Sequence, residues 1–303
     1  MISKIAQFVL ILMISPFLFG VINRTKAFLA GRKGAPLFQL YYDIFKLLRK
    51  GAVYSASTTW VFVAGPIVSL SAVIVASFII PISGRSSIIS FDGDLILFFY
   101  LLGLARFFTC LAALDTGSSF EGMGASREVQ FAVFAEPALF MSLAALARLT
   151  GKSSLTDIFG SSQIHSWASY GPLLCLAIAA LFIVFLAENS RIPVDDPNTH
   201  LELTMIHEVM VLDHGGVDFA YILYGAAIKF CILGSLITGI ILKGNSYGWG
   251  IDTIIFIVCM VLLAVVVGVV ESTMARLRLL KVPHFLLVAL SLSLVAFIIS
   301  LRQ

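Results

Sequence analysis

Charged residues are unusually scarce in this chain, at 12% of its 303 residues. A soluble domain carries about 25% charged residues, enough to cover a surface that faces water. Hydrophobic residues make up 59% of the sequence. This composition excludes an ordinary soluble protein and predicts an integral membrane protein.

Grouped cysteines and linker-like segments are also missing. The four cysteines lie singly in four different apolar segments: Cys110, Cys175, Cys231 and Cys259. Iron–sulfur and zinc sites need clustered thiolates, and the histidines at 200, 207 and 214 lack the i, i+4 spacing of a helical metal site. We therefore predict no metal and no cofactor in this chain. Because no Ser/Gly/Pro-rich linker divides it, residues 1–303 are expected to form a single membrane domain.

The apolar runs have the length of membrane-spanning helices. About 20 mostly apolar residues cross a hydrocarbon core about 30 Å thick. Eight runs qualify, so the predicted fold class is an all-α integral membrane protein with eight transmembrane helices. They lie near residues 5–22, 61–81, 95–114, 129–149, 171–187, 219–242, 251–270 and 283–301.

Basic residues are divided unequally between the two sets of loops. Twelve Lys and Arg residues fall on the side of the loops after the first and seventh spans, and five fall on the other side. The positive-inside rule then places both termini on the outer, periplasmic side of the cell inner (plasma) membrane. The net charge of +3 comes from these loops. It indicates attraction to a lipid bilayer and not binding to a nucleic acid.

The first cytoplasmic loop contains a helical pattern. Residues 36–50 place apolar side chains at helical spacing, with Asp43, Lys46 and Arg49 on the other face. This pattern predicts an amphipathic helix at the membrane interface. Two roles are open for it, a membrane-surface anchor and a docking surface for a partner.

The loop after the fifth span concentrates charge where a helix leaves the bilayer. Glu188 and Arg191 are spaced to pair across one helical turn, and Pro193 then breaks the helix. Asp196 is a candidate N-cap for a following helix.

Charged residues lie within or at the end of several predicted spans, including Arg106 in the third. Glu136 precedes Pro137 in the fourth span, Lys229 lies in the sixth, and Glu271 ends the seventh. A carboxylate in hydrocarbon costs about 3 kcal/mol on insertion scales and needs a partner or water. The alternatives are a proton relay and a structural ion pair, for Glu136 with Arg106 or Lys229.

The stretch Ala-Glu-Asn-Ser-Arg-Ile-Pro-Val-Asp at 187–195 resembles the signature of the membrane subunit that anchors the peripheral arm of respiratory complex I. Two other loops agree with that family. One is Arg32-Lys33-Gly34 followed by Gln39, Asp43 and Lys46; the other is Gly124 to Glu128. The segments 114–118 and 274–279 resemble the version found in formate hydrogenlyase and hydrogenase-4.

The resemblance implies a non-catalytic membrane anchor and ion-coupling subunit of a group 4 energy-converting [NiFe]-hydrogenase complex. It implies as partners an iron–sulfur small subunit, a [NiFe]-type large subunit and antiporter-like membrane subunits, with the iron–sulfur clusters and the Ni-Fe centre in those partners. By family analogy and from the span charges, the predicted ion pathway comprises Glu136, Glu188, Glu202, Lys229, Asp195, Arg191 and Glu271. The predicted docking residues are Arg32, Lys33, Gln39, Asp43, Lys46, Arg127 and Glu128.

Departures from the complex I pattern bear on quinone binding. Asn198, His200 and Met210 occupy positions where complex I has further carboxylates, and Lys229 lies near its missing sixth-span acid. These changes favour a hydrogenase-type complex. The alternatives are the quinone-site subunit of a complex I-like NADH/quinone oxidoreductase, a free-standing ion transporter and a passive anchor.

Overall fold

The computed structural model describes residues 2–82, 85–195, 205–242 and 248–302, and within them the chain is helical without strands. The α-helices in chain order are α1 (Ile2–Leu29), α2 (Gln39–Leu48), α3 (Trp60–Ile79), α4 (Asp94–Asp115), α5 (Ser119–Thr150), α6 (Leu155–Phe159), α7 (Trp167–Glu188), α8 (Gly216–Ile241), α9 (Trp249–Thr273) and α10 (Val282–Leu301). Two short 3₁₀ turns, η1 (Glu208–Val211) and η2 (Leu279–Lys281), precede α8 and α10.

Eight helices in the described part of the chain are long and apolar enough to cross a membrane, so the predicted fold class is confirmed. They correspond one to one with the predicted spans, but several extend further. α1 continues to Leu29 and α5 begins at Ser119, ahead of the predicted 129. The added segments contain most of the polar and charged residues of these helix ends. A helix that leaves hydrocarbon keeps its backbone hydrogen bonds after its hydropathy falls.

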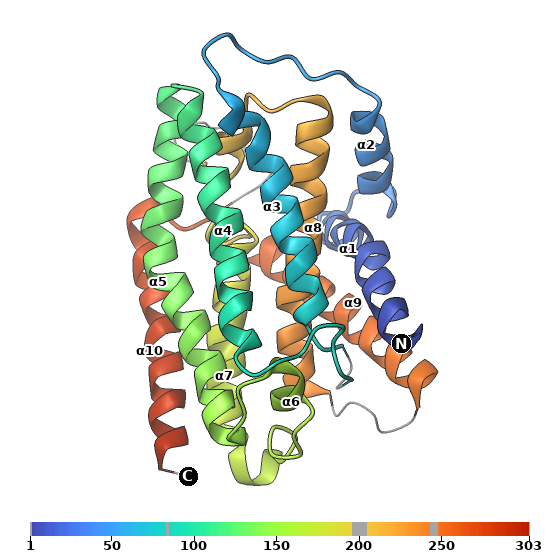
Figure 1. Cartoon of the computed structure of the whole chain (residues 1–303), viewed down its shortest axis with the longest axis vertical. Helices are drawn as coiled ribbons and strands as arrows, with labels where there is room; N and C mark the ends of the chain where they lie inside the picture. Colours follow the sequence, from blue (N-terminus) through green and yellow to red (C-terminus); the bar gives the residue numbers. More distant parts are fainter. Residues whose placement is uncertain (1, 83–84, 196–204, 243–247, 303) are drawn as a thin grey trace.

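The helices form an upright bundle with two tilted members. Figure 1 shows α3, α4, α5, α7, α8 and α10 running roughly parallel to the long axis, with α1 and α9 inclined beside them. α3 packs on α4, α5 on α10 and α1 on α9. α8 is buried continuously from Phe230 to Thr238, as expected for a helix that is apolar on all sides and surrounded by others.

The loops gather in two groups at opposite ends of the bundle. In one group Leu277 N–H donates to the Pro193 carbonyl at 2.9 Å, and Gly216 lies against the carbonyl of Gly51. In the other, the Ser87 and Thr156 hydroxyls are 2.8 Å apart. We call the end that holds loops 30–38, 49–59, 189–195 and 274–278 the basic side. The sorting of these loops to one end agrees with the predicted topology.

The predicted amphipathic helix is present as α2, which packs against α1 and α8 (Figure 1). Leu40, Ile44 and Leu47 are half-buried in this contact, whereas Leu37 and Leu48, predicted for the same face, are exposed. The connection into α2 passes very close to α1 at Gly20, where any Cβ would collide with the Leu37 carbonyl. A glycine is therefore required at this crossing.

Candidate functional site

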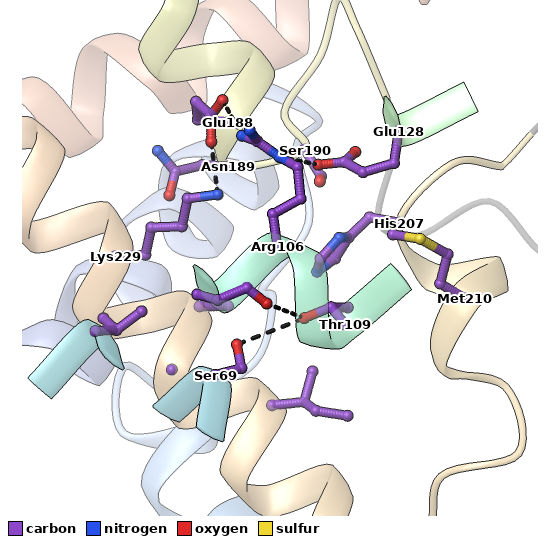
Figure 2. A pocket seen from close by; sticks show the side chains of 15 residues that line it. Ser69, Arg106, Thr109, Glu128, Glu188, Asn189, Ser190, His207, Met210 and Lys229 are labelled. Carbon is purple, nitrogen blue, oxygen red and sulfur yellow. Dashed lines mark hydrogen bonds and ion pairs between the residues drawn. The ribbon is translucent and has the colours of Figure 1, made fainter. Parts of the chain in front are cut away.

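Charged side chains from four helices converge on one arginine inside the bundle. We call Arg106 with Glu128, Glu136, Glu188 and Lys229 the Arg106 cluster. Arg106 uses a different guanidinium nitrogen for each carboxylate: Nε for Glu128 at 3.2 Å, and the two terminal nitrogens for Glu136 and Glu188. Lys229 Nζ lies 2.7 Å from the other oxygen of Glu188. Figure 2 shows Arg106 and Lys229 approaching Glu188 from two directions.

Helix geometry explains how these groups meet. Glu128 and Glu136 are eight residues apart on α5, which places them on similar faces about two turns apart. Glu188 is the last residue of α7, and Lys229 lies in α8. Arg106 projects from α4 into the space between these helices. Its planar guanidinium has several N–H donors, so this one side chain connects α4, α5 and α7.

Burial differs sharply among the members of the cluster. The side chains of Arg106 and Glu188 are 9% and 3% exposed, whereas that of Glu136 is 50% exposed. Two cations face three carboxylates, so the ionised cluster carries one excess negative charge. Charged groups at this depth persist when they are paired with one another or with polar atoms, and here each carboxylate has at least one cationic partner.

A small cavity adjoins the cluster. Its volume is about 80 Å³, enough for water molecules. Besides the cluster, it is lined by polar groups including Ser69, Thr109, Asn189 and His207 (Figure 2). A second, smaller cavity shares Arg106, Glu128 and Glu188 with the first and extends to Asp195. The residues that line the two cavities extend from Lys229 in α8 to Asp195 in the loop that follows α7.

Asp195 organises the inner end of that loop. Its carboxylate accepts hydrogen bonds from the backbone N–H groups of Ile206 and His207, both at 3.1 Å, and pairs with Arg276 at 2.8 Å. It therefore ties the chain on both sides of residues 196–204 to the segment before η2. Burial of the His207 ring lowers its pKa below the usual value. The neutral form of the imidazole is therefore favoured beside the cavity.

A second charged group lies between α1, α9 and the loop after α7. We call Lys26, Arg191 and Glu271 the Glu271 cluster. Glu271 is fully enclosed and pairs with Lys26 at 2.8 Å and Arg191 at 3.3 Å. The Arg191 guanidinium also lies 4.3 Å above the centre of the Phe19 ring. Burial lowers the pKa of Arg191, opposed by the attraction of Glu271.

The predicted pairing of Glu188 with Arg191 is wrong. Glu188 turns to Arg106 and Lys229, and Arg191 turns to Glu271. Glu188 ends its helix, so the helical spacing that would bring the two side chains together is lost at the next residue. The predicted structural pair of Glu136 with Arg106 is present, whereas Lys229 pairs with Glu188.

The predicted docking residues have varied surroundings. Arg32, Lys33 and Lys46 are exposed on the basic side. Gln39 donates to Asp43 at 2.9 Å within α2, and Arg127 donates to the Met205 carbonyl at 2.8 Å. Glu128 differs from the others because it faces inward to the Arg106 cluster. The structure thus places the docking candidates without testing their role.

Some predicted residues lie outside the described ranges, namely Glu202 of the ion pathway, the candidate cap Asp196, and Asn198 and His200.

Of the other two loop histidines, His207 lines the cavity and His214 stacks on Phe62 with ring centres 3.9 Å apart. Within the described ranges, no three His, Cys, Asp or Glu side chains form a group that could hold a metal ion.

Arg106 and His207 belong to the site but were in neither the predicted pathway set nor the predicted docking set. Arg106 appeared only as a possible partner of Glu136, yet it is the residue on which the cluster is built. An arginine inside a span was itself a sufficient signal, because such charges are rare and usually functional. His207 gave no comparable signal, because its place beside the cavity depends on the hydrogen bonds to Asp195.

The chain is similar in sequence to membrane subunits of oxidoreductase complexes. Hydrogenase-4 component C of Escherichia coli (strain K12) is 30% identical over 303 residues, covering 98% of this chain and 95% of that protein. Formate hydrogenlyase subunit 4 of the same organism is 28% identical over 299 residues, covering 96% of each chain. One subunit of the NADH-quinone oxidoreductase of Burkholderia vietnamiensis (strain G4 / LMG 22486) is 24% identical over 220 residues, covering 69% of this chain and 61% of that protein.

The fold also matches a solved structure and a family model. A chain in the structure of the membrane-bound sulfane sulfur reductase, an archaeal respiratory membrane complex, superposes with a TM-score of 0.85 over 99% of this chain and 98% of that one, at 20% identity. The family model described as NADH dehydrogenase matches residues 3–301. The chain therefore belongs to the NADH dehydrogenase family and is a membrane subunit related to those of hydrogenase-4, formate hydrogenlyase and complex I.

Proposed function

We propose that this chain anchors a hydrogenase-type peripheral arm to the cell inner membrane and couples electron transfer in that arm to translocation of H⁺ or Na⁺. The partners would be an iron–sulfur subunit, a [NiFe]-type subunit and antiporter-like membrane subunits. The similarity to hydrogenase-4 component C and formate hydrogenlyase subunit 4 supports this assembly. The basic side would face the cytoplasm, with both termini outside, as its excess of Lys and Arg favours.

The observation that carries the coupling role is the Arg106 cluster with its adjoining cavities. Arg106 is shared by three carboxylates, and Glu188 is shared by Arg106 and Lys229, so a change in the protonation of one carboxylate would alter the pairing of the others. The cavities offer a polar route from Lys229 to Asp195 at the basic side. A proton that enters by this route would neutralise one carboxylate. The Arg106 or Lys229 side chain that had paired with this carboxylate would then pair with a neighbouring one.

Asp195 would connect this route to the peripheral arm, and Arg191 would hold the same loop in place. Both belong to the loop after α7, and each is tied to the segment at 271–276, Asp195 through Arg276 and Arg191 through Glu271. A partner that moves this loop on the basic side would therefore change the position of Glu188 relative to Arg106. Arg32, Lys33 and Lys46, with Gln39, Asp43 and Arg127, are proposed as contacts to that partner.

The substitution Glu188→Gln tests coupling in the assembled complex. Glutamine keeps the size and can still accept hydrogen bonds, but it cannot ionise. We expect electron transfer to continue while ion translocation in proteoliposomes falls at least about tenfold, in line with loss of a positioned proton-transfer group. Translocation at the wild-type rate would refute the coupling role.

Glu121→Gln is the matched control. Glu121 is also a buried acid, but it lies outside the Arg106 cluster and accepts a hydrogen bond from the Asp213 N–H at 3.1 Å. Glutamine can keep this bond, so translocation should remain at the wild-type level. Equal loss in both variants would point to a general effect of removing buried charge.

The anchoring role is tested by purifying the tagged chain from native membranes in mild detergent and identifying co-purifying proteins by mass spectrometry. We expect iron–sulfur, nickel-type and antiporter-like subunits. A chain that comes out alone in several detergents would favour a free-standing transporter instead.

Quinone reduction is the second candidate, supported by the similarity to the NADH-quinone oxidoreductase of Burkholderia vietnamiensis. Pockets for small molecules usually measure about 300–1,000 Å³. The cavity beside the Arg106 cluster, about 80 Å³ among the described residues, is smaller and suits water or an ion better. Quinone-dependent oxidation by the purified complex would reverse this preference.

A further inference from the structure

Glu136 is a half-exposed carboxylate on the outer face of a membrane-spanning bundle. It lies in the interior of α5, away from both ends of the helix, and its side chain is 50% exposed. Pro137 and Val133 beside it are exposed as well. In a membrane this face meets hydrocarbon or another membrane protein, since water does not reach it from the bundle surface.

The surface around Glu136 is a groove between α4 and α5. Its volume is about 480 Å³ and its walls are apolar and largely aromatic, with Tyr100, Phe107 and Phe140 prominent among the exposed side chains. Gly103 contributes to the floor of the groove and leaves open space where a side chain would stand. Glu136 is the carboxylate among the described residues that line this groove.

The charges inside the bundle leave Glu136 incompletely neutralised. Its partner Arg106 also serves Glu128 and Glu188, and Lys229 pairs with Glu188. Among the described residues the Arg106 cluster therefore has one positive charge fewer than its carboxylates, and the most exposed of these carboxylates is Glu136. Besides its contact with Arg106, the half-exposed carboxylate of Glu136 has room for a further cation or donor, which would remove the excess negative charge of the cluster. Lipid tails supply neither, and headgroups lie away from the interior of the span.

We propose that the groove between α4 and α5 receives a membrane-spanning helix of a neighbouring subunit, and that this helix brings a basic side chain against Glu136. This inference rests on the proposed function, because it assumes that the chain works within a multi-subunit complex. The apolar walls of the groove fit the apolar side chains of a transmembrane helix. The excess negative charge of the Arg106 cluster favours a basic side chain on that helix. The Arg106 cluster would then continue into the neighbouring subunit.

Photo-crosslinking in native membranes tests the contact. A photoreactive phenylalanine analogue replaces Phe107, which is exposed beside Glu136 and outside the ion-pair cluster. We expect an adduct with a hydrophobic segment of another subunit that contains Lys, Arg or His within one or two helical turns. Adducts with lipid, with a second copy of this chain or with a span lacking such a residue would overturn the proposal.

Charge reversal provides a second test that does not depend on the probe. Glu136→Lys should reduce the neighbouring subunit recovered with the purified complex at least about tenfold, because two like charges would then face each other. Replacing the partner's basic residue by Glu should restore recovery in this variant. Unchanged recovery in Glu136→Lys, or failure of the reciprocal change to restore it, would contradict the proposed pair.

These results are distinguishable from failure of the coupling role. Crosslinking and subunit recovery do not require ion translocation. A crosslinked helix with a basic residue, together with normal translocation in Glu188→Gln, would retain the docking surface and reject coupling. Loss of translocation in Glu188→Gln without any crosslinked subunit would retain coupling and reject the docking surface.

Discussion

The two charged clusters of this protein have opposite compositions. In the Glu271 cluster two cations, Lys26 and Arg191, surround one fully enclosed carboxylate, and an aromatic ring supports the arginine. In the Arg106 cluster two cations serve three carboxylates, one of which reaches the outer surface. The first cluster joins α1, α9 and the loop after α7. The second borders the cavities.

This difference indicates different roles for charges that lie close together in the sequence. In the Glu271 cluster the cations outnumber the single enclosed acid, which suits a structural connection between α1, α9 and the loop after α7. An acid-rich group beside a cavity large enough for water is better suited to bind and release a proton or another cation. Glu271 and Arg191, predicted as pathway residues, therefore fit a supporting role better than Glu188 and Glu136 do, although their roles stay predictions.

The largest expected effect on stability comes from Glu271→Ala. This change leaves the buried guanidinium of Arg191 without its carboxylate, which typically costs about 3–5 kcal/mol. Lys26 contributes less because its side chain is 23% exposed and can turn to water. Thermal unfolding in detergent, followed by circular dichroism, should show a lower midpoint.

Ser272→Ala is the neighbouring control. The Ser272 hydroxyl donates to the Gly268 carbonyl within its own helix, at 2.7 Å, and the residue is exposed. Its removal should change stability by no more than about 0.5 kcal/mol. A Glu271→Ala protein as stable as this control would show that the Glu271 cluster is not a structural connection.

The next effect concerns a titratable group outside both clusters. His214 is buried against Phe62, and burial lowers its pKa from 6.5 to about 4. The unfolded chain therefore binds this proton more readily, so His214 makes stability fall as the pH drops from about 6.5 to about 4. His214→Phe should remove that component and flatten the decline.

The measurement is the unfolding midpoint of both proteins across this pH range. His207, whose pKa is also lowered by burial, remains in both and contributes equally. Parallel curves for wild type and His214→Phe would contradict the assignment. A flatter curve for the variant would separate the titration of His214 from any titration of the charged clusters.

The smallest effect is expected for the ion pair at the end of the bundle opposite the basic side. Arg85 pairs with Asp252 at 3.3 Å, and its side chain is 23% exposed. Asp252 is buried, but it lies in the first turn of α9, where the positive end of the helix dipole also stabilises its charge, so Arg85→Ala should cost only about 1–2 kcal/mol. Ion translocation should be unchanged, because the pair lies away from the cavities. A strong loss of translocation in this variant would mean that function does not distinguish the Arg106 cluster from other charges.

Much of the fold was predictable because hydropathy reports each span independently. The eight apolar runs identified the eight helices, and the sorting of basic residues agreed with the grouping of the loops. The ends were less predictable. Helix α5 extends well beyond its apolar part, since hydropathy marks the edge of the hydrocarbon and helix ends depend on capping and packing.

Less of the site could be read from the sequence. Glu136 and Lys229 were recognisable as charges inside spans, and Arg106 was a plausible partner. The pairing of Glu188 with Lys229 requires knowledge that α7 and α8 lie side by side, which local spacing does not contain. The predicted Glu188–Arg191 pair was wrong for the same reason. Residue spacing shows which side chains are neighbours on one helix, but it contains no information on partners from other helices.

The most direct test of the account compares two matched substitutions, Arg106→Lys and Arg191→Lys, by the number of ions translocated per electron transferred in the assembled complex. Lysine keeps the charge but has one ammonium group, which cannot hold three carboxylates as a guanidinium does. We predict that Arg106→Lys lowers this ratio about tenfold and that Arg191→Lys leaves it unchanged while reducing stability. An unchanged ratio in Arg106→Lys, or an equal loss in both variants, would contradict the claim that the Arg106 cluster carries the ion.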